Sequence, residues 1–439
     1  MRRIYPDHAY SDARSDGCYW ATTVPDSALE RPPLLGAQKA DVAIIGAGFT
    51  GLSAALALAQ AGVSVALLDA GFPGWGASGR NGGFCCLGGA MASDLMLDRQ
   101  FGKPARLAYR QAEIAAVHHV ATTLDTYKIQ AQTHSKGETQ LAHKSSIDFT
   151  DQARAIEENY GVSPILHSKS ELPALGMSGP FHSALTTPIG FGLNPRRYLA
   201  GLLSAAKAAG VRVFGRSPVQ NITHSAGYHL ATPQGILSAE NIIVATNGYA
   251  SEDLPPWMAA RYLPAQSSVI VTREMTKTEL ANGWNSDQAA YDSRTLLHYF
   301  RLMPGRRFLF GMRGGLNSSA ASEARNRRKI RADFEAMFPA WAHVETPYHW
   351  SGMVCLSANL TPFAGAIPEM PGAYAGFAYH GNGVAMGSYT GVLLADQILG
   401  TDKLHRPKLM AQPPKRFPLG RARRALMYAA YAAATLRDL

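Results

Sequence analysis

The sequence predicts an α/β fold with parallel strands covered by helices, accompanied by a separate antiparallel sheet. Three observations support this prediction. A short apolar run at 42–45 is followed by glycines, a helical pattern and a second apolar run at 65–68, as in a βαβ unit. Alternating helix and strand patterns return at 195–214 and 374–399. Between them, 261–313 carries strand patterns around a Pro-Gly turn, which is typical of antiparallel hairpins.

The glycines after the first apolar run have the spacing of a dinucleotide-binding turn. Gly46 lets the chain turn, Gly48 lets a pyrophosphate approach the backbone, and Gly51 lets the helix pack on its strand. Asp69 ends the second run, where a carboxylate can accept hydrogen bonds from ribose hydroxyls and would repel a 2′-phosphate. These features in register predict a bound adenine dinucleotide; the alternative is a glycine-tolerant βαβ unit without a ligand.

The remaining elements follow in order along the chain. Residues 71–90 contain eight glycines and are expected to form a loop whose backbone approaches a ligand. Apolar periodicity predicts helices over 104–124, 195–210, 323–338 and 384–399, and strands over 211–214, 242–245, 295–303, 307–313 and 374–379. The stretch 136–179 has mixed character and is interpreted as an insertion.

Composition excludes several classes of protein. The chain has 439 residues, of which 46% are hydrophobic and 17% charged, which suits a globular protein of two or three domains rather than a disordered one. No apolar segment reaches membrane-spanning length, and the N-terminus lacks the apolar core of a signal peptide. Four cysteines without CxxC spacing disfavour zinc. We therefore expect no metal and a cytoplasmic location.

The net charge of +10 comes largely from the C-terminal segment, 402–439. We expect a helix over 425–436 that packs on its own domain with the tail arginines in solvent. The alternative is a basic helix in peripheral contact with a membrane surface. Because the positive charge is concentrated in one tail rather than along a groove, no nucleic-acid partner is expected.

Taken together, these motifs resemble the D-amino-acid-oxidase-like (DAO) FAD-dependent amine oxidoreductases over about Asp41 to Gly400. The shared motifs are Gly46–Gly51, the loop at 76–84, Asn194–Tyr198, Ile243–Tyr249 and the Gly-x-Gly that opens the last helix. The loop, Ala245–Tyr249 and Leu297–Leu302 look most like the γ-glutamylputrescine oxidase branch.

The resemblance implies a Rossmann-like FAD-binding domain assembled from discontinuous segments, plus an antiparallel-sheet substrate domain. The expected boundaries are a leader at 1–36, the FAD-binding domain at 37–110, 180–256 and 350–401, the substrate domain at 111–179 and 257–349, and the tail at 402–439. A helix N-terminus at Gly381-Asn382-Gly383 is expected to face the flavin, where its positive dipole end stabilises negative charge.

The resemblance also implies the residues that hold FAD. The glycines of the first turn would hold the pyrophosphate, Asp69 the ribose and Val219 the adenine side, while the glycine-rich loop would line the pyrophosphate and isoalloxazine. The expected cofactor residues are Gly46, Gly48, Phe49, Thr50, Gly51, Asp69, Ala70, Ala77, Ser78, Gly79, Arg80, Asn81, Gly82, Gly83, Val219, Thr246, Asn247, Gly248, Gly381, Asn382, Gly383 and Val384.

Substrate binding is expected from the antiparallel domain, with no catalytic side chain because the flavin does the chemistry. Strand alternation places Tyr299 and Arg301 on one face, where an arginine can hold a carboxylate or simply be solvated. The weaker candidates are His298, Arg313, Tyr262 and His380. Tyr262, Trp350 and Tyr379 form either an aromatic wall or ordinary core.

Two positions bear on the branch of the family. Ala385 stands where sarcosine oxidases carry a lysine, so a sarcosine-type carboxylate clamp is incomplete. Cys355 falls near the position of a cysteine that links flavin covalently in that branch, and the alternative is a buried structural cysteine. Non-covalent FAD is the expectation.

The resulting prediction is FAD-dependent oxidation of a C–N bond in a primary or secondary amine. The expected substrate is a γ-glutamylated polyamine or an amino-acid-like molecule, and oxygen or another acceptor reoxidises the flavin. The alternatives are an oxidase of N-methyl, cyclic or D-amino acids, a tRNA-directed flavin module, and a non-catalytic FAD module. A nicotinamide dehydrogenase explains neither the loop at 71–90 nor the final Gly-x-Gly helix.

Overall fold

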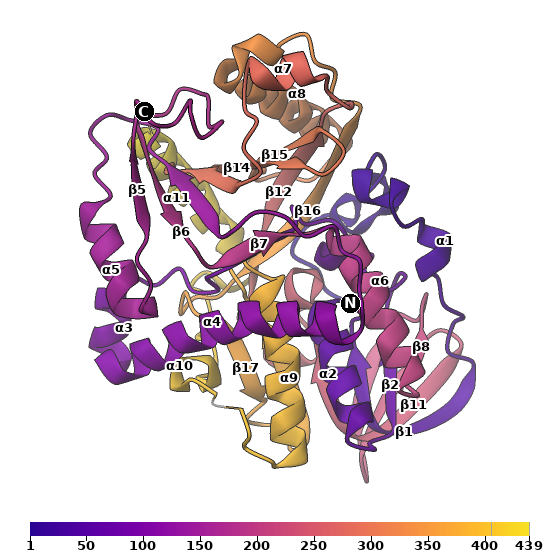
Figure 1. The fold of residues 1–439 in the computed structure, drawn as a ribbon. Coiled ribbons are helices and arrows are strands. Elements are labelled where there is room, and N and C mark those ends of the chain that lie inside the picture. Colours follow the sequence, from indigo (N-terminus) through magenta and orange to yellow (C-terminus); the bar gives the residue numbers. More distant parts are fainter. Residues whose placement is uncertain (405, 439) are drawn as a thin grey trace.

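The computed structural model describes residues 1–404 and 406–438 and contains two eight-stranded sheets. A mostly parallel sheet, here called the parallel sheet, lies in the lower half of Figure 1, and the antiparallel sheet lies in the upper half. The chain passes between the two sheets several times, so each of them is built from segments far apart in the sequence.

The parallel sheet has the order β17-β18-β11-β1-β2-β8, and the ribbon of β9 and β10 joins it at β11. β1 runs parallel to both β2 and β11, and residues 42–44 near its C-terminal end are fully buried because both faces of the sheet are covered there. The strands are β1 (Gly36–Ile45), β2 (Val65–Leu68), β8 (Arg212–Phe214), β9 (Asn221–His224), β10 (Tyr228–Ala231), β11 (Gly235–Val244), β17 (Phe363–Ala366) and β18 (Ala373–Phe377).

Helices α2 (Phe49–Gln60) and α9 (Ala385–Leu399) pack against one face of the parallel sheet, while α6 (Pro195–Ala208) packs on α2 and α4 (Lys103–Thr126) packs on α9. Helices α2 and α9 approach each other closely at Gly391. A Cβ atom at this position would lie 2.3 Å from the Thr50 carbonyl oxygen and 2.8 Å from the Ala54 nitrogen. A glycine in α9 therefore fixes the position of the α2 N-terminus.

The antiparallel sheet has the order β16-β12-β15-β14-β13-β4-β6-β5. Phe300, Phe308 and Phe310 on one of its faces pack under α8 (Ala320–Met337) together with Phe334 and Trp341, while the other face is turned toward the parallel half. The strands are β4 (Glu138–Leu141), β5 (Ile165–Ser168), β6 (Ser183–Thr187), β12 (Leu263–Val271), β13 (Ala289–Asp292), β14 (His298–Met303), β15 (Arg307–Arg313) and β16 (Tyr348–Leu356). The short helix α7 (Lys277–Ala281) and the ribbon of β3 (Phe84–Cys86) and β7 (Gly190–Gly192) complete this half.

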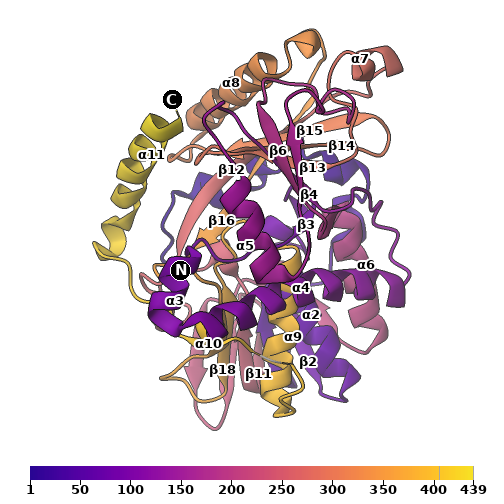
Figure 2. The same ribbon diagram turned by 60° about the vertical axis from the view of Figure 1, so that its left-hand side comes forward.

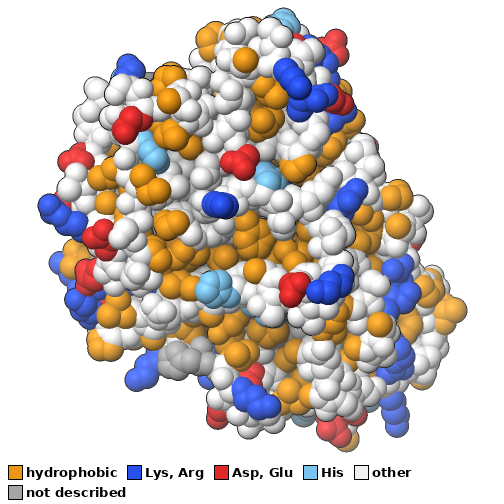
Figure 3. Space-filling model, viewed as in Figure 1, with side chains coloured by type: hydrophobic (Ala, Val, Ile, Leu, Met, Phe, Trp, Pro, Cys, Tyr) orange, Lys and Arg blue, Asp and Glu red, His pale blue; other side chains and the backbone are white. Residues whose placement is uncertain are grey.

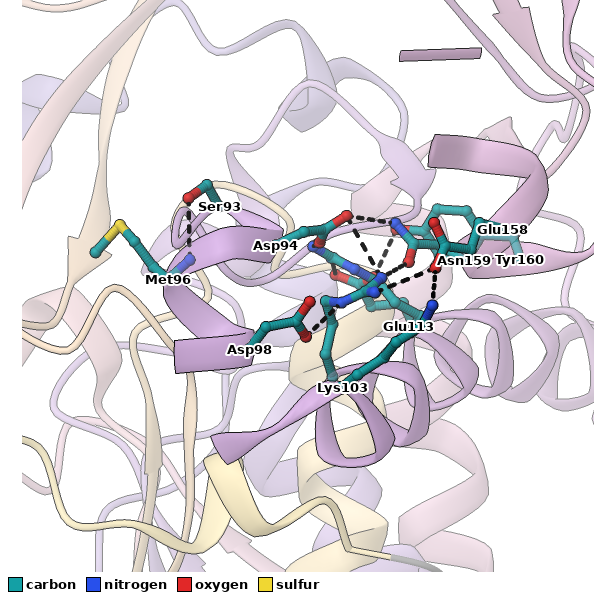
Figure 4. A network of polar contacts seen from close by, with 11 residues as sticks. Ser93, Asp94, Met96, Asp98, Lys103, Glu113, Glu158, Asn159 and Tyr160 are labelled. Atoms are coloured by element: carbon teal, nitrogen blue, oxygen red, sulfur yellow. Dashed lines mark hydrogen bonds and ion pairs between the residues drawn. The ribbon is translucent and has the colours of Figure 1, made fainter. Parts of the chain in front are cut away.

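A polar network joins α4 to α3 (Asp94–Phe101) and α5 (Thr150–Tyr160) (Figure 4). Two arginines of α4 hold it together. Arg106 Nε donates to Asp98 at 2.7 Å, while Arg110 contacts both Asp94 at 2.7 Å and Glu113 at 2.8 Å. The Tyr160 hydroxyl donates to the same Glu113 carboxylate at 2.7 Å. The buried Glu113 carboxylate thus has both a cationic partner and a hydroxyl donor.

The predicted domain boundaries differ from the observed sheets in three places. β6, which lies inside the predicted FAD-binding segment 180–256, pairs with β4 and β5 of the antiparallel sheet. β16, at the start of 350–401, pairs along its whole length with β12. Conversely, residues 111–126 continue the unbroken helix α4 and pack on α9. The boundaries fail because strand pairing across long sequence separations, not chain order, sets the membership of each sheet.

The leader at 1–36 contains α1 (Asp26–Leu29) and is packed rather than loose. Arg14 is buried and donates to Ser351 Oγ at 2.8 Å and Ser318 Oγ at 3.1 Å. The Trp20 indole donates to the Asn81 carbonyl at 2.9 Å. The leader therefore ties the glycine-rich loop to the antiparallel sheet.

The tail forms α10 (Lys408–Ala411) and α11 (Arg424–Asp438), and α11 lies at the outer edge of the molecule in Figure 2. Met427 packs against Leu263 and Ala265. Arg423 is fully buried and ion-paired with Glu252, so the expectation that the tail arginines are solvated is wrong for this residue.

Two negative findings concern the described residues. Within 1–404 and 406–438, no helix combines the length and apolar character needed to cross a membrane. The same residues contain no group of three or more His, Cys, Asp or Glu side chains arranged to hold a metal ion.

Candidate active site

The turn between β1 and α2 brings the helix N-terminus to the edge of the parallel sheet. Gly46 has a φ of +108°, and a Cβ atom on it would lie 2.7 Å from the Ala245 carbonyl oxygen. A Cβ atom on Gly51 would lie 1.9 Å from the Gly46 oxygen. Gly48 is the N-cap of α2, so the positive end of the helix dipole points out of this turn. Each of these three positions thus requires glycine for a different physical reason, as the spacing predicts.

Asp69 follows β2 and holds this turn in place. Its two carboxylate oxygens accept hydrogen bonds from the Ala47 nitrogen at 2.7 Å and the Gly71 nitrogen at 2.8 Å. Burial raises the pKa of Asp69 to about 6, while both backbone donors act to lower it. A carboxylate has about four acceptor positions, so two of them are free for further donors.

One cavity of about 450 Å³ extends from this turn to the N-terminus of α9. The space-filling view of Figure 3 shows apolar side chains gathered in a band across the middle of the molecule, between its two halves. Most of the expected cofactor residues line the cavity: Gly46, Gly48, Phe49, Thr50, Asp69, Ala70, Ala77, Ser78, Arg80, Asn81, Gly82, Val219, Thr246, Asn247, Gly381, Asn382, Gly383 and Val384.

Four of the expected cofactor residues lie behind the cavity wall instead. These are the glycines Gly51, Gly79, Gly83 and Gly248. A Cβ atom on Gly79 would lie 2.2 Å from the Gly74 oxygen, and one on Gly83 would lie 2.0 Å from the Leu193 oxygen. These four glycines shape the wall by close packing against other backbone. The geometry therefore disfavours direct contact between them and the cofactor.

His380 lies at the other end of the cavity and is held by both ring nitrogens. Nδ1 donates to the Gly89 carbonyl at 2.8 Å, and Nε2 accepts from the Ser357 nitrogen at 3.2 Å. Burial lowers the pKa of His380 to about 4, so the ring is neutral at pH 7. It anchors the Gly381–Gly383 turn and has no free nitrogen for a substrate.

The antiparallel sheet turns one row of polar side chains into the cavity. Ser267 on β12, Arg313 on β15, Tyr299 on β14, Tyr291 on β13 and Glu138 on β4 all line it. The Ser267 and Tyr299 hydroxyls are 2.9 Å apart. A Cβ atom on Gly381 would lie 3.4 Å from Arg313 Nη2, so the guanidinium lies over the turn that precedes α9.

Arg301 is not a substrate residue, contrary to the sequence-based expectation. It lies on the same side of β14 as Tyr299, but it is buried outside the cavity lining. Its Nε donates to the Gly82 carbonyl at 2.9 Å and its Nη2 to the Leu193 carbonyl at 2.7 Å, while Nη1 contacts the His134 ring at 2.8 Å. Burial lowers the pKa of Arg301 to about 9. Its donors are consumed by structural contacts.

His298 and Tyr262 are also corrected by the structure. The His298 ring lies on the opposite face of β14, between the Asp292 carboxylate at 2.9 Å and the Asp333 carboxylate at 3.2 Å. Burial acts to lower the pKa of His298, but the two carboxylates together outweigh it and raise the pKa. Tyr262 is fully buried and donates to the Ala250 carbonyl at 2.8 Å. Neither residue lines the cavity.

The remaining candidates divide between the cavity and the core. Tyr379 lines the cavity, and its hydroxyl lies 2.8 Å from Thr50 Oγ1. Trp350 is core and donates to the Arg80 carbonyl at 2.6 Å. Cys355 lines the cavity but is almost completely buried, which raises the pKa of its thiol to about 12.

Several cavity residues lie outside the set predicted from the sequence. Glu138 and Tyr291 come from strands that were not predicted, although the alternation in Glu138–Leu141 was a signal for a half-buried strand. Arg3 and Tyr10 of the leader also line the cavity, and no local pattern marks them.

A comparison with protein families gives this geometry its context. Residues 41–397 match the family described as FAD dependent oxidoreductase (DAO). The chain belongs to this family. The prediction of an FAD-dependent oxidoreductase and of FAD as its cofactor is thereby confirmed.

Curated relatives of this FAD dependent oxidoreductase span nearly its whole length. A probable oxidoreductase OrdL of Rhizobium meliloti is 31% identical over 437 residues, covering 97% of this chain and 98% of the relative. The corresponding protein of Haemophilus influenzae is 30% identical over 379 residues, covering 85% and 86%. The γ-glutamylputrescine oxidoreductase of Escherichia coli is 27% identical over 403 residues, covering 91% and 92%.

Solved structures share the fold at lower identity. Glycine oxidase from Geobacillus kaustophilus superposes with a TM-score of 0.68 at 20% identity, covering 85% of this chain and 98% of that one. L-amino acid deaminase from Proteus vulgaris gives a TM-score of 0.70 at 16% identity, covering 87% and 99%. These likenesses confirm the predicted fold class.

The cavity of this FAD dependent oxidoreductase has the chemistry that an anionic dinucleotide requires. Arg80 is buried against it, with its guanidinium 4.6 Å from the centre of the Trp75 ring. In the described part of the chain, Arg80 Nη2 and Thr246 Oγ1 are buried without hydrogen-bond partners. Buried polar atoms of this kind are normally satisfied, so the residues present fit a bound FAD.

Proposed function

We propose that the protein oxidises a C–N bond in a primary or secondary amine that also carries a carboxylate, such as a γ-glutamylated polyamine. The observation that carries this proposal is the position of Arg313. Its half-buried guanidinium lines the cavity beside Gly381, and no ion pair or side-chain hydrogen bond engages it among the described residues. An arginine in such a position can bind a carboxylate bidentately. The γ-glutamylputrescine oxidoreductase among the relatives supports this substrate class.

The proposed cofactor contacts follow from the cavity lining. Gly48 and Thr50, at the N-terminus of α2, hold the pyrophosphate through backbone donors. Gly46 contributes by forming the turn, since its own N–H donates to the Leu68 carbonyl at 2.8 Å. Asp69 accepts from the ribose with its remaining acceptor positions, and Val219 flanks the adenine.

The glycine-rich loop holds the middle of the cofactor. Ser78, Arg80 and Asn81 line the cavity where the pyrophosphate meets the isoalloxazine. Arg80 carries the unpaired Nη2 in this region, so its guanidinium supplies both a positive charge and a free donor.

The chemistry needs little from side chains. Bound FAD supplies a hydride acceptor for the carbon next to the substrate nitrogen, and the resulting imine hydrolyses. The protein orients that carbon through Arg313 and the row of hydroxyls at Ser267 and Tyr299. The N-terminus of α9 carries about half a positive charge and faces the same cavity.

His380 contributes as a positioning residue rather than as an acid or base. Because its Nδ1 and Nε2 are both engaged with backbone groups, it fixes the turn that leads into α9. Removal of the ring would loosen Gly381 and, with it, the floor under Arg313.

The decisive experiment is anaerobic mixing of the FAD-loaded protein with an amine panel, followed by flavin absorbance. We expect γ-glutamylputrescine to bleach the flavin and readmitted oxygen to restore it with formation of hydrogen peroxide. If pipecolate, sarcosine or a D-amino acid bleaches the flavin and γ-glutamylputrescine does not, the γ-glutamylated substrate is wrong. If no amine does, the catalytic proposal fails.

A second candidate is the oxidation of an N-methyl, cyclic or D-amino acid, because Arg313 suits the carboxylate of these molecules equally well. The panel separates it from the first candidate. A tRNA-directed role has less support, since Arg423 is ion-paired with Glu252 and Arg424 donates to the Leu316 carbonyl at 2.7 Å.

A further inference from the structure

Glu138 is a carboxylate on the same cavity-facing side of the antiparallel sheet as Arg313, three strands away from it. It lies on β4, where it pairs with Ala289 of β13, and it lines the same cavity as Arg313 and Tyr291. The strand order β15-β14-β13-β4 places three strand spacings between the two charged residues. At roughly 4.8 Å per spacing, their backbones are separated laterally by about 14 Å.

Two fully buried carboxylates in the described part of the chain have strong partners, whereas the half-buried Glu138 in the cavity wall has no cationic one. The Glu113 carboxylate accepts hydrogen bonds from Arg110 Nη1 at 2.8 Å and from the Tyr160 hydroxyl at 2.7 Å (Figure 4). Asp292 Oδ2 lies 2.9 Å from Nδ1 of the His298 ring. Within residues 1–404 and 406–438 no ion pair involves the Glu138 side chain, and its hydrogen-bonding neighbour is the Cys86 thiol, which is only a weak donor. A carboxylate removed from water needs a cationic or hydrogen-bonding partner.

The described groups around Glu138 supply no positive charge, so a cationic partner has to come from the cavity. Its ionisable neighbours are Cys86 on β3, Tyr291 on β13 and Glu113 on α4. Burial and the Glu113 charge raise the pKa of Glu138 to about 7, against a smaller opposing effect of Cys86. None of these neighbours is a cation, so a positively charged group arriving in the cavity is the natural counterion.

We propose that Glu138 binds the ammonium group of the substrate while Arg313 binds its carboxylate. The site then selects elongated molecules whose two charges are several bonds apart and discriminates against α-amino acids, in which the charges are adjacent. This inference rests on the proposed amine oxidation and names the substrate class within it.

The test measures ligand binding to the FAD-loaded protein by titration calorimetry, with 6-aminohexanoate, hexanoate and hexylamine as probes. We expect the wild type to bind 6-aminohexanoate at least about tenfold more tightly than hexanoate, as a charge-assisted contact predicts. Glu138→Gln should abolish this preference and weaken hexylamine binding to a similar extent. Glu138→Asp, which restores the charge, should recover part of it.

The control variant is Glu157→Gln, which removes a negative charge from an exposed position on α5. It should leave all three affinities unchanged. A second measurement needs no variant: hexylamine affinity of the wild type should fall as the pH drops below about 7 and Glu138 is protonated, whereas hexanoate affinity should not fall.

The inference is overturned if neither ammonium probe binds the wild type, or if Glu138→Gln and the wild type bind both ammonium probes equally. These results do not depend on turnover. Failure of every amine to bleach the flavin would instead remove the proposed oxidation, so the two failures can be told apart.

Discussion

The Arg313 guanidinium lies directly over Gly381, where a Cβ atom would be 3.4 Å from Nη2. Gly381 has a φ of +117° and belongs to the turn that leads into α9. The contact joins the last residue of β15 to the helix whose N-terminus faces the cavity. A substrate held by Arg313 is therefore held at a fixed place relative to that helix.

Replacement of Arg313 by Met should weaken the binding of carboxylate ligands. Loss of a charge-assisted contact costs about 1.5–3 kcal/mol, which corresponds to an increase of about ten- to hundredfold in Kd or KM. Arg307→Lys on the same strand is the control, because Arg307 donates to the Thr272 carbonyl outside the cavity. Unchanged affinity for hexanoate in Arg313→Met would rule out the carboxylate anchor.

Protonation of His380 should destabilise the fold below neutral pH. Its pKa is about 4 in the folded protein and about 6.5 in the unfolded chain. Because the unfolded chain binds more protons between these values, the free energy of unfolding rises with pH across this window. We expect the His380 contribution to be about 2 kcal/mol smaller at pH 5 than at pH 7.5.

Denaturant unfolding of the wild type and of His380→Gln at both pH values measures this effect. The variant should be less stable at pH 7.5 and should show a shallower dependence on pH. Identical pH dependence in the two proteins would mean that His380 is not held neutral in the fold.

Acid precipitation should release the flavin into the supernatant. Burial raises the pKa of the Cys355 thiol to about 12, and the thiolate is the form that attacks a flavin, so covalent attachment is disfavoured. Cys355→Ala should behave like the wild type. Yellow colour that stays in the wild-type pellet and leaves the Cys355→Ala pellet would establish a covalent bond.

The dinucleotide turn was predictable from sequence because its physics is local. Gly51 packs against Gly46, and Asp69 accepts from the neighbouring Ala47 nitrogen, all within a single βαβ unit, so spacing alone encodes their arrangement. Strand alternation also placed Tyr299 and Arg301 on one side of β14, as observed. What alternation could not predict is that residues near Gly82 and Leu193 cover Arg301 and leave only Tyr299 in the cavity.

The substrate side of the cavity was harder to predict because it is assembled by distant pairings. Glu138 reaches the cavity through the parallel pairing of β4 with β13, about 150 residues further along the chain. Arg313 was a weak candidate until the contact with Gly381 placed it over the helix turn. The periodicity of one segment does not reveal how that segment pairs with a distant one.

Replacement of Gly391 by Ala should weaken both the fold and the hold on FAD. The new Cβ atom would lie 2.3 Å from the Thr50 carbonyl oxygen and 2.8 Å from the Ala54 nitrogen. Both contacts are with backbone, so α2 and α9 must separate. Overpacking of this kind costs about 1–3 kcal/mol, and the shift displaces the α2 N-terminus at Gly48, which lines the cavity.

Gly387→Ala is the matched control in the same helix, since its Cβ atom would meet only side-chain atoms, Tyr379 Cε2 at 3.2 Å and Thr50 Oγ1 at 3.3 Å. Thermal unfolding and fluorescence titration with FAD measure the two effects. We expect Gly391→Ala to lower the unfolding temperature and raise the Kd for FAD, and Gly387→Ala to change both much less. Equal behaviour of the two variants would show that the close approach at Gly391 does not position the cofactor-binding helix.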